Sequence, residues 1–163
     1  MPDLISINPR SVVDVLSALL TPTIAVLAVY IAYQQWRVNR TRLDLDLYDR
    51  RLAIYKALEE FYDGIAIPGN VRFPMVAKLR FETAEARFLF PKEIEKHLDL
   101  LRMKAFRAAQ LRERLYPKSE EPGLPVGDAR DKAVDEESKL LDEIQGPLWD
   151  KSKNLFLKYL TLA

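Results

Sequence analysis

The chain has 163 residues, with 25 lysines and arginines against 24 aspartates and glutamates, so its formal net charge is +1. This near balance argues against a dedicated nucleic-acid binder, because such proteins carry a strong basic excess. The chain has no cysteine and only 5 glycines. It is rich in Leu, Ala, Lys, Arg and Glu, a composition that favours helix. We therefore expect an all-α protein.

An apolar run lies near the amino end, where the 19 residues from Val15 to Tyr33 include no charged side chain. A helix of this length covers roughly 29 Å, about the thickness of the hydrocarbon core of a bilayer. We predict a short extracytoplasmic stub over residues 1–10 and an uncleaved transmembrane helix over residues 11–36. The alternative is the buried core helix of a soluble protein, which is normally shorter.

Arginine is distributed unevenly around this run. Arg10 alone precedes it, whereas five arginines follow it, namely Arg37, Arg40, Arg42, Arg50 and Arg51. Positive charge near a membrane stays in the cytoplasm, so we predict a single pass with the amino end outside and residues 37–163 as a cytosolic helical domain. Membrane lipid is then an expected partner, and its headgroups would contact Trp36, Arg37, Arg40 and Arg42.

Small and polar residues recur on one stripe of the predicted membrane helix at alternating spacings of three and four. The stripe consists of Asp14, Ala18, Thr21, Ala25, Ala28, Ala32, Gln35 and Asn39. Small side chains let two helices approach closely in lipid, and the polar ones add modest hydrogen bonds between helices. The stripe is therefore a candidate packing face, either for a second copy or for a helix of another protein. Alanine is common in any membrane helix, so chance spacing is the alternative.

The remainder of the chain predicts amphipathic helices. One long helix is expected from about Ser11 to Asp63, with Leu47, Ile54, Leu58, Phe61 and Ile65 on its apolar face. Pro68, Gly69 and Pro74 then interrupt it. A second helix is expected over residues 75–90, with Val76, Leu79, Thr83, Ala86 and Phe90 on one face and Phe81 and Phe88 adding bulk.

Two further helices follow. Pro91 starts one of them, on which Ile94, Leu98, Leu101, Ala105, Ala108 and Leu115 share a face. A loop rich in proline leads to the other helix, with Asp128 as its expected N-cap, an apolar face that includes Val134 and Leu141, and a bend at Gly146–Pro147. We expect the membrane helix to continue into an antiparallel bundle of about four helices.

Charge differs between the last two predicted helices. Residues 92–118 are mainly basic, and residues 128–143 are mainly acidic. Two neighbouring helices with attracting sides explain this pattern most simply, because exposed charge on helices is mostly solvated. The alternative is a basic surface for an acidic partner or lipid.

No motif for catalysis or cofactor binding is present. His97, the only histidine, follows Glu93 by four residues, but two ligands are too few for a metal site, so we expect an exposed helical histidine. Asp44, Asp46 and Asp49 lack the glycine and glutamate of a calcium loop. We therefore predict no catalytic, cofactor-binding or metal-binding residues, and a protein that is not an enzyme.

Three blocks of the sequence resemble those of a group of small single-pass bacterial inner-membrane proteins. They are Leu45-Asp46-Leu47-Tyr48-Asp49-Arg50-Arg51, the segment EARFLF at residues 85–90, and FLKYLTL at residues 156–162. The resemblance implies a bacterial inner-membrane protein with a cytosolic helical domain, and it brings no activity with it. Within these blocks, Asp49, Arg50, Arg51, Glu85 and Arg87 are expected to form either a polar clamp between the first two helices or a docking site for a partner.

These features favour a non-enzymatic, membrane-anchored helical interaction protein. It would associate with itself, or serve as an accessory subunit of a larger membrane complex. The alternative is a membrane-perturbing or pore-forming effector of a bacterial defence or toxin system. A pore of that kind requires a polar face within the membrane, for which Asp14, Thr21 and Gln35 are the candidates.

Overall fold

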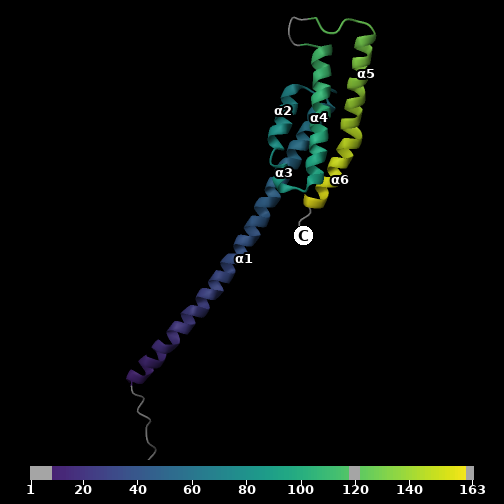
Figure 1. Ribbon diagram of the computed structural model, residues 1–163. Coiled ribbons are helices and arrows are strands. Elements are labelled where there is room, and N and C mark those ends of the chain that lie inside the picture. The colour runs from purple at the N-terminus through teal and green to yellow at the C-terminus, as the bar shows by residue number, and fades with distance from the viewer. Residues whose placement is uncertain (1–8, 118–121, 161–163) are drawn as a thin grey trace, which may run out of the picture. The chain divides into compact units, whose positions relative to one another are not determined.

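The computed structural model describes residues 9–117 and 122–160, apart from the side chains of residues 9–13, 15, 16 and 21. All regular structure in these ranges is helical (Figure 1). The elements are α1 (Pro9–Ala66), α2 (Phe73–Glu82), α3 (Ala86–Leu89), α4 (Lys92–Leu115), α5 (Asp128–Glu143), the π-helical segment η1 (Ile144–Leu148) and α6 (Trp149–Leu160). The expected all-α class is confirmed for the described part of the chain.

Helix α1 is 58 residues long and includes Pro22. The expectation of one long helix that ends before Pro68 is confirmed. Thr23 Oγ1 donates to the carbonyl oxygen of Leu19 at 2.7 Å, beside the position where Pro22 provides no backbone N–H. The chain divides into two compact units between Asp46 and Leu47, so α1 contributes to both. We describe the two units separately.

The first unit consists of α1 as far as Asp46. Its large apolar side chains are exposed, including Leu19, Ile24, Val26, Leu27, Val29 and Ile31. The 18-residue window with the highest mean hydropathy, 1.5, has no buried residue. Among the described residues, α1 is the one helix that is both long and apolar enough to cross a membrane.

The second unit has one main core. Residues 47–66 of α1 contribute Ile54, Leu58, Phe61 and Ile65 to this core, as their spacing predicts, whereas Leu47 is 41% exposed. Aromatic rings join α1 to α6, with ring centroids 4.4 Å apart for Tyr62 and Trp149 and 5.7 Å apart for Tyr55 and Phe156. This core fixes α1 against the carboxyl-terminal helix.

The helix expected over residues 75–90 is divided in two. Helix α2 ends at Glu82, residues 83–85 form a turn, and α3 follows. The buried face is nevertheless as predicted, because Val76, Leu79, Thr83, Ala86 and Phe90 are all buried. Phe81 and Phe88 do not add to that face, because they are 84% and 76% exposed. At 100° per residue, Phe81 lies about 140° from Val76 on α2, and Phe88 lies about 160° from Ala86 on α3.

Helices α4 and α5 are neighbours joined by ion pairs. Arg107 forms two hydrogen bonds with the Glu136 carboxylate, at 2.8 and 3.1 Å, and Lys104 pairs with Glu143. The interpretation of the charge difference as two neighbouring helices is therefore confirmed. In α5, Val134 is 40% exposed, which corrects its expected burial, and Ala133 and Glu137 face the core instead.

The ends of α5 depend on glycine and proline. Gly127, at φ 146°, is the N-cap, so Asp128 is the first helical residue and not the expected cap. Such a positive φ strongly favours glycine. At the other end, the predicted disturbance at Gly146–Pro147 is the π-helical segment η1. Pro147 has no backbone N–H to donate to the carbonyl four residues earlier, and a π-bulge accommodates the loss of that helical hydrogen bond.

Candidate functional site: the groove between α2 and α4

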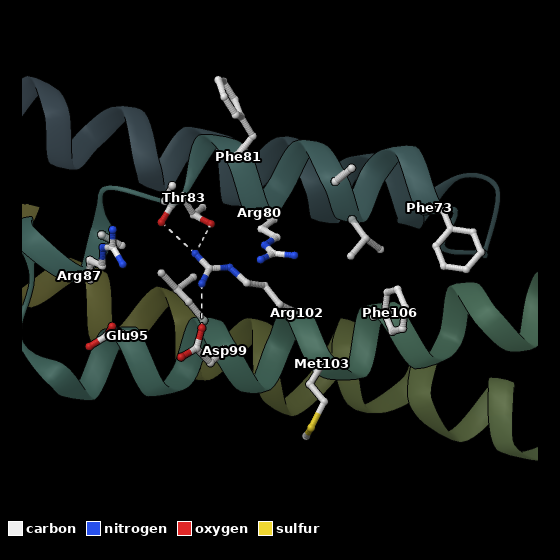
Figure 2. A pocket seen from close by; sticks show the side chains of 15 residues that line it. Phe73, Arg80, Phe81, Thr83, Arg87, Glu95, Asp99, Arg102, Met103 and Phe106 are labelled. Carbon is white, nitrogen blue, oxygen red and sulfur yellow. Dashed lines mark hydrogen bonds and ion pairs between the residues drawn. The ribbon is translucent and has the colours of Figure 1, made fainter.

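A groove of about 1010 Å³ lies between α2 and α4. Its buried apolar members, Val76, Ala86 and Leu98, belong to the core, and Phe81, Met103 and Phe106 are exposed around it. Figure 2 shows Phe73 and Phe106 facing each other at one end, where their ring centroids are 5.5 Å apart. We call this feature the α2/α4 groove. It combines apolar surface with arginine side chains.

Arg102 lies in the middle of the α2/α4 groove (Figure 2). Its Nη2 donates to the carbonyl oxygen of Thr83 at 2.8 Å and to Thr83 Oγ1 at 2.6 Å, and its Nη1 donates to Asp99 at 2.8 Å. These bonds tie α4 to the turn that follows α2. The buried Nε of Arg102 has no hydrogen-bond partner within the described residues.

Two more arginines line the α2/α4 groove. Arg80 extends from α2 toward α4 in Figure 2, and no hydrogen bond or ion pair holds it within the described part of the chain. Arg87 lies with its guanidinium carbon 4.6 Å from the ring centroid of Phe88. A guanidinium over an aromatic ring keeps its N–H groups available at the ring edge. The groove therefore presents N–H donors suited to a carboxylate or a phosphate.

The five residues of the expected clamp are brought together only in part. Arg50 Nη1 and Glu85 Oε2 are 4.0 Å apart, and both side chains are more than half exposed. Arg51 Nε donates to the carbonyl oxygen of Leu89 at 3.1 Å, and its guanidinium lies 5.7 Å from the ring centroid of Phe90. Asp49 and Arg87 form no contact with each other in the residues described. Helix α1 is thus tied to α3 mainly through Arg51.

The candidate residues of the membrane segment lie on the first unit. Asp14, Ala18, Ala25, Ala28, Ala32, Gln35 and Asn39 are exposed, and the side chain of Thr21 lies outside the described ones. Arg37, Arg40 and Arg42 are exposed as well, and Trp36 is 57% exposed. The Arg40 guanidinium carbon is 5.7 Å from the Trp36 ring centroid, and the rings of Tyr33 and Trp36 are 6.1 Å apart. Aromatic and basic groups are therefore adjacent at the end of the apolar run.

His97 is buried, with 3% of its surface exposed, so the expectation of an exposed histidine is wrong. Its Nε2 is 2.8 Å from Ser152 Oγ, and Tyr62 Oη is 3.5 Å from the same oxygen. Burial is the main cause that lowers the pKa of His97, and Lys151 adds to it. Ser152 is fully buried, so this His–Ser pair is enclosed in the core and has no opening for a substrate.

No metal-binding cluster is found in the described ranges, in which no group of three or more His, Asp or Glu side chains comes together. The sequence did not identify Arg80, Arg102 and Phe106 as site residues. One sequence feature could have indicated the groove, namely the Arg-Phe dipeptide that occurs at residues 80–81 and again at residues 87–88. Both dipeptides lie away from the predicted buried face. Arg102 gave no such signal, because its role depends on the packing of α2 against α4.

Comparison with known proteins finds no match for this chain among protein-family models, curated proteins or solved structures.

Proposed function

We propose that the chain is a non-enzymatic, membrane-anchored assembly protein of a bacterial inner membrane. Its α1 helix crosses the bilayer once, its amino end lies outside, and the second unit forms an antiparallel helical bundle in the cytosol. It associates with itself or with another membrane complex. The observation that carries this proposal is the 18-residue window of α1, which has a mean hydropathy of 1.5 and no buried residue.

The exposure of this window supports insertion into lipid. Leu20, Val26 and Val29 are 61%, 69% and 70% exposed. Leaving a continuous run of such side chains in water is unfavourable by about 25 cal/mol for each Å² of apolar surface, and a bilayer removes that cost. The core helix of a soluble protein would bury at least one side of the run. A membrane-spanning role is the simplest explanation of an unburied apolar helix.

The residues after the apolar run support the proposed orientation. Trp36 stacks near both Tyr33 and Arg40, an arrangement suited to the headgroup region. Arg37, Arg40 and Arg42 then favour the cytoplasmic side, where anionic lipid attracts them. The contacts of Trp36 with Tyr33 and Arg40 support a headgroup region at this end of the apolar run.

The α2/α4 groove supports an interaction role. Phe81, which lines the groove, is 84% exposed, and the arginine donors of Arg80 and Arg87 line the same groove. Exposed aromatic and arginine side chains are typical of protein interfaces. The enclosed His97–Ser152 pair offers no site for nucleophilic catalysis. Binding therefore explains the surface of the second unit better than chemistry does.

Alkaline extraction of cell membranes tests the anchor. We expect the full-length protein to stay in the membrane pellet at high pH and to dissolve only in detergent. The double variant Val26→Lys with Val29→Lys should move it to the supernatant, because lysine near the bilayer centre costs about 2.5–3.5 kcal/mol per residue. Val126→Lys, at a loop position that is 94% exposed, is the matched control and should leave extraction unchanged. Release of the unaltered protein at high pH without detergent would overturn the proposal.

A further inference from the structure

Some arginine N–H donors of the α2/α4 groove have no partner within the described residues of the same copy of the chain. Arg80 has no ion-pair partner within the described residues, and Arg102 Nε has no hydrogen-bond partner there. Met103 and Phe106 are 62% and 48% exposed beside these donors. An occupant that fits would be a helix with carboxylates along its centre and small apolar groups at its side. From Glu95 to Phe106 the groove extends over about three helical turns, roughly 16 Å.

The outer face of α5 has that composition. Asp131, Asp135 and Asp142 are exposed, and no ion pair engages them within the described ranges. At 100° per residue they fall within about 40° of one another, with the half-exposed Val134 alongside. We call this face the α5 stripe. It is also about three turns long, since 11 residues separate Asp131 from Asp142.

The α5 stripe cannot occupy the α2/α4 groove of its own copy. Helix α4 lies between α2 and α5 in Figure 1, and α4 contacts both of them. Ala133 and Ile144, on the opposite side of the helical path from the stripe, are buried in the core. The stripe therefore faces away from the groove, and the two surfaces can meet only between different copies.

We propose that the α2/α4 groove binds the α5 stripe of a second copy, so that copies associate head to tail. Arg80 and Arg87 then pair with aspartates of the stripe, and Val134 packs against Met103 and Phe106. This contact deepens the assembly role proposed above, because it names the partner and the surface. Because the groove and the stripe face away from each other on one copy, a single pair leaves one groove and one stripe unoccupied. On a membrane it therefore extends into rows or closes into rings.

Disulfide cross-linking tests the contact directly, because the chain contains no cysteine. Full-length Met103→Cys and Val134→Cys proteins, with different tags, are mixed in lipid nanodiscs or mild detergent and oxidised. We expect the mixed 103–134 dimer to be the main product, well above either homodimer. Asn154→Cys, at an exposed position on α6, is the control partner for both and should give only background. Homodimers as the main product, or no product above that background, would overturn the proposal.

Charge reversal gives a second, independent readout. Arg80→Glu with Arg87→Glu, and separately Asp135→Lys with Asp142→Lys, should each weaken self-association by about tenfold or more. An equal mixture of the two variants should restore association, because each altered surface then meets its complement. Lys158→Glu, at an exposed position on α6, is the control for the change in net charge. Failure of the mixture to restore association would contradict a head-to-tail contact.

The outcomes separate this inference from the membrane anchor. If the 103–134 product is absent while the protein resists alkaline extraction, the head-to-tail contact is wrong and the anchor stands. If the product forms with a protein that alkali releases, the anchor is wrong and the contact stands.

Discussion

The imidazole of His97 on α4 and the hydroxyl of Ser152 on α6 lie 2.8 Å apart inside the core. Ser152 Oγ also lies 2.8 Å from the carbonyl oxygen of Leu148, to which it donates its only proton. His97 Nε2 must therefore carry a proton and donate to Ser152, and the buried Nδ1 has no hydrogen-bond partner within the described residues. Burial lowers the pKa of His97 from its ordinary 6.5, which favours the neutral form in the folded state.

This arrangement makes stability depend on pH. The pKa of folded His97 is lowered from its ordinary 6.5, so the unfolded chain binds a proton that the folded chain does not. We expect the free energy of unfolding to fall as pH drops below 6.5, by up to about 1.4 kcal/mol per pH unit from this group. Thermal unfolding of the full-length chain between pH 8 and pH 5, followed by circular dichroism, measures it.

The control for this pH dependence is His97→Gln, which keeps a side-chain N–H donor toward Ser152 and does not titrate. It should cost about 1 kcal/mol or less at pH 8 and should reduce the slope between pH 6.5 and pH 5. If the free energy of unfolding of His97→Gln still fell as steeply between pH 6.5 and pH 5, another group would be responsible for the pH dependence in this range.

Arg102 is expected to stabilise the packing of α2 on α4. Arg102→Lys retains the charge but loses the planar fork that reaches both Thr83 oxygens and Asp99. We expect a loss of about 1–3 kcal/mol, because the carbonyl of the buried Thr83 loses its charged donor. Arg80→Lys, on the same groove and without a bonded partner, should change stability by less than about 0.5 kcal/mol. Equal effects in urea unfolding would contradict this role.

Substitution of two adjacent glutamates on α5 is predicted to change the stability of the fold in opposite directions. Burial raises the pKa of Glu137 above 4.5, although Arg112 opposes the shift, so its ionised form weakens the folded state above that pH. Glu137→Gln should raise stability at pH 7 by roughly 0.5–1 kcal/mol after allowance for solvent screening, and the gain should vanish below pH 4.5. Glu136→Gln, which removes the pair with Arg107, should lower stability at pH 7. Changes of the same sign in both variants would be inconsistent with these environments.

The small-residue stripe of α1 gives a prediction within the membrane. Ala25→Leu with Ala28→Leu should weaken association in a membrane two-hybrid assay, because the larger side chains keep neighbouring helices apart. Val26→Leu, about 100° from Ala25 around the helix and therefore off the stripe, is the control for hydrophobicity. An unchanged signal in the stripe variant would exclude this face as a contact.

Periodicity in the sequence was sufficient to identify most of the core. On α4, the predicted face of Ile94, Leu98, Leu101, Ala105, Ala108 and Leu115 is buried throughout. His97 was misassigned because of its residue type, although its position lies about 60° from Ile94 on the helix, within the apolar arc. Ser152, its partner, lies 55 residues further along the chain, so the pair depends on how α6 packs against α4.

The α2/α4 groove shows what periodicity does not predict. Phe81 and Phe88 were assigned by hydrophobicity alone, whereas their angular positions place them outside the buried face. The turn at residues 83–85 depends on Thr83, which bonds to Leu79 and accepts from Arg102. The bond to Leu79 is local to the end of α2, but the contact with Arg102 requires α4 to pack beside this turn, and the pattern of a single helix contains no information about that contact.

Accessibility of introduced cysteines tests the central claim most directly, since the chain itself has none. Ser6→Cys lies before α1, and Asn154→Cys lies at an exposed position on α6, away from the proposed contact between copies. In intact cells with a permeabilised outer envelope, a membrane-impermeant maleimide should label Ser6→Cys and should label Asn154→Cys only after lysis. Labelling of both positions only after lysis, or of Asn154→Cys in intact cells, would contradict a single pass with the helical domain in the cytosol.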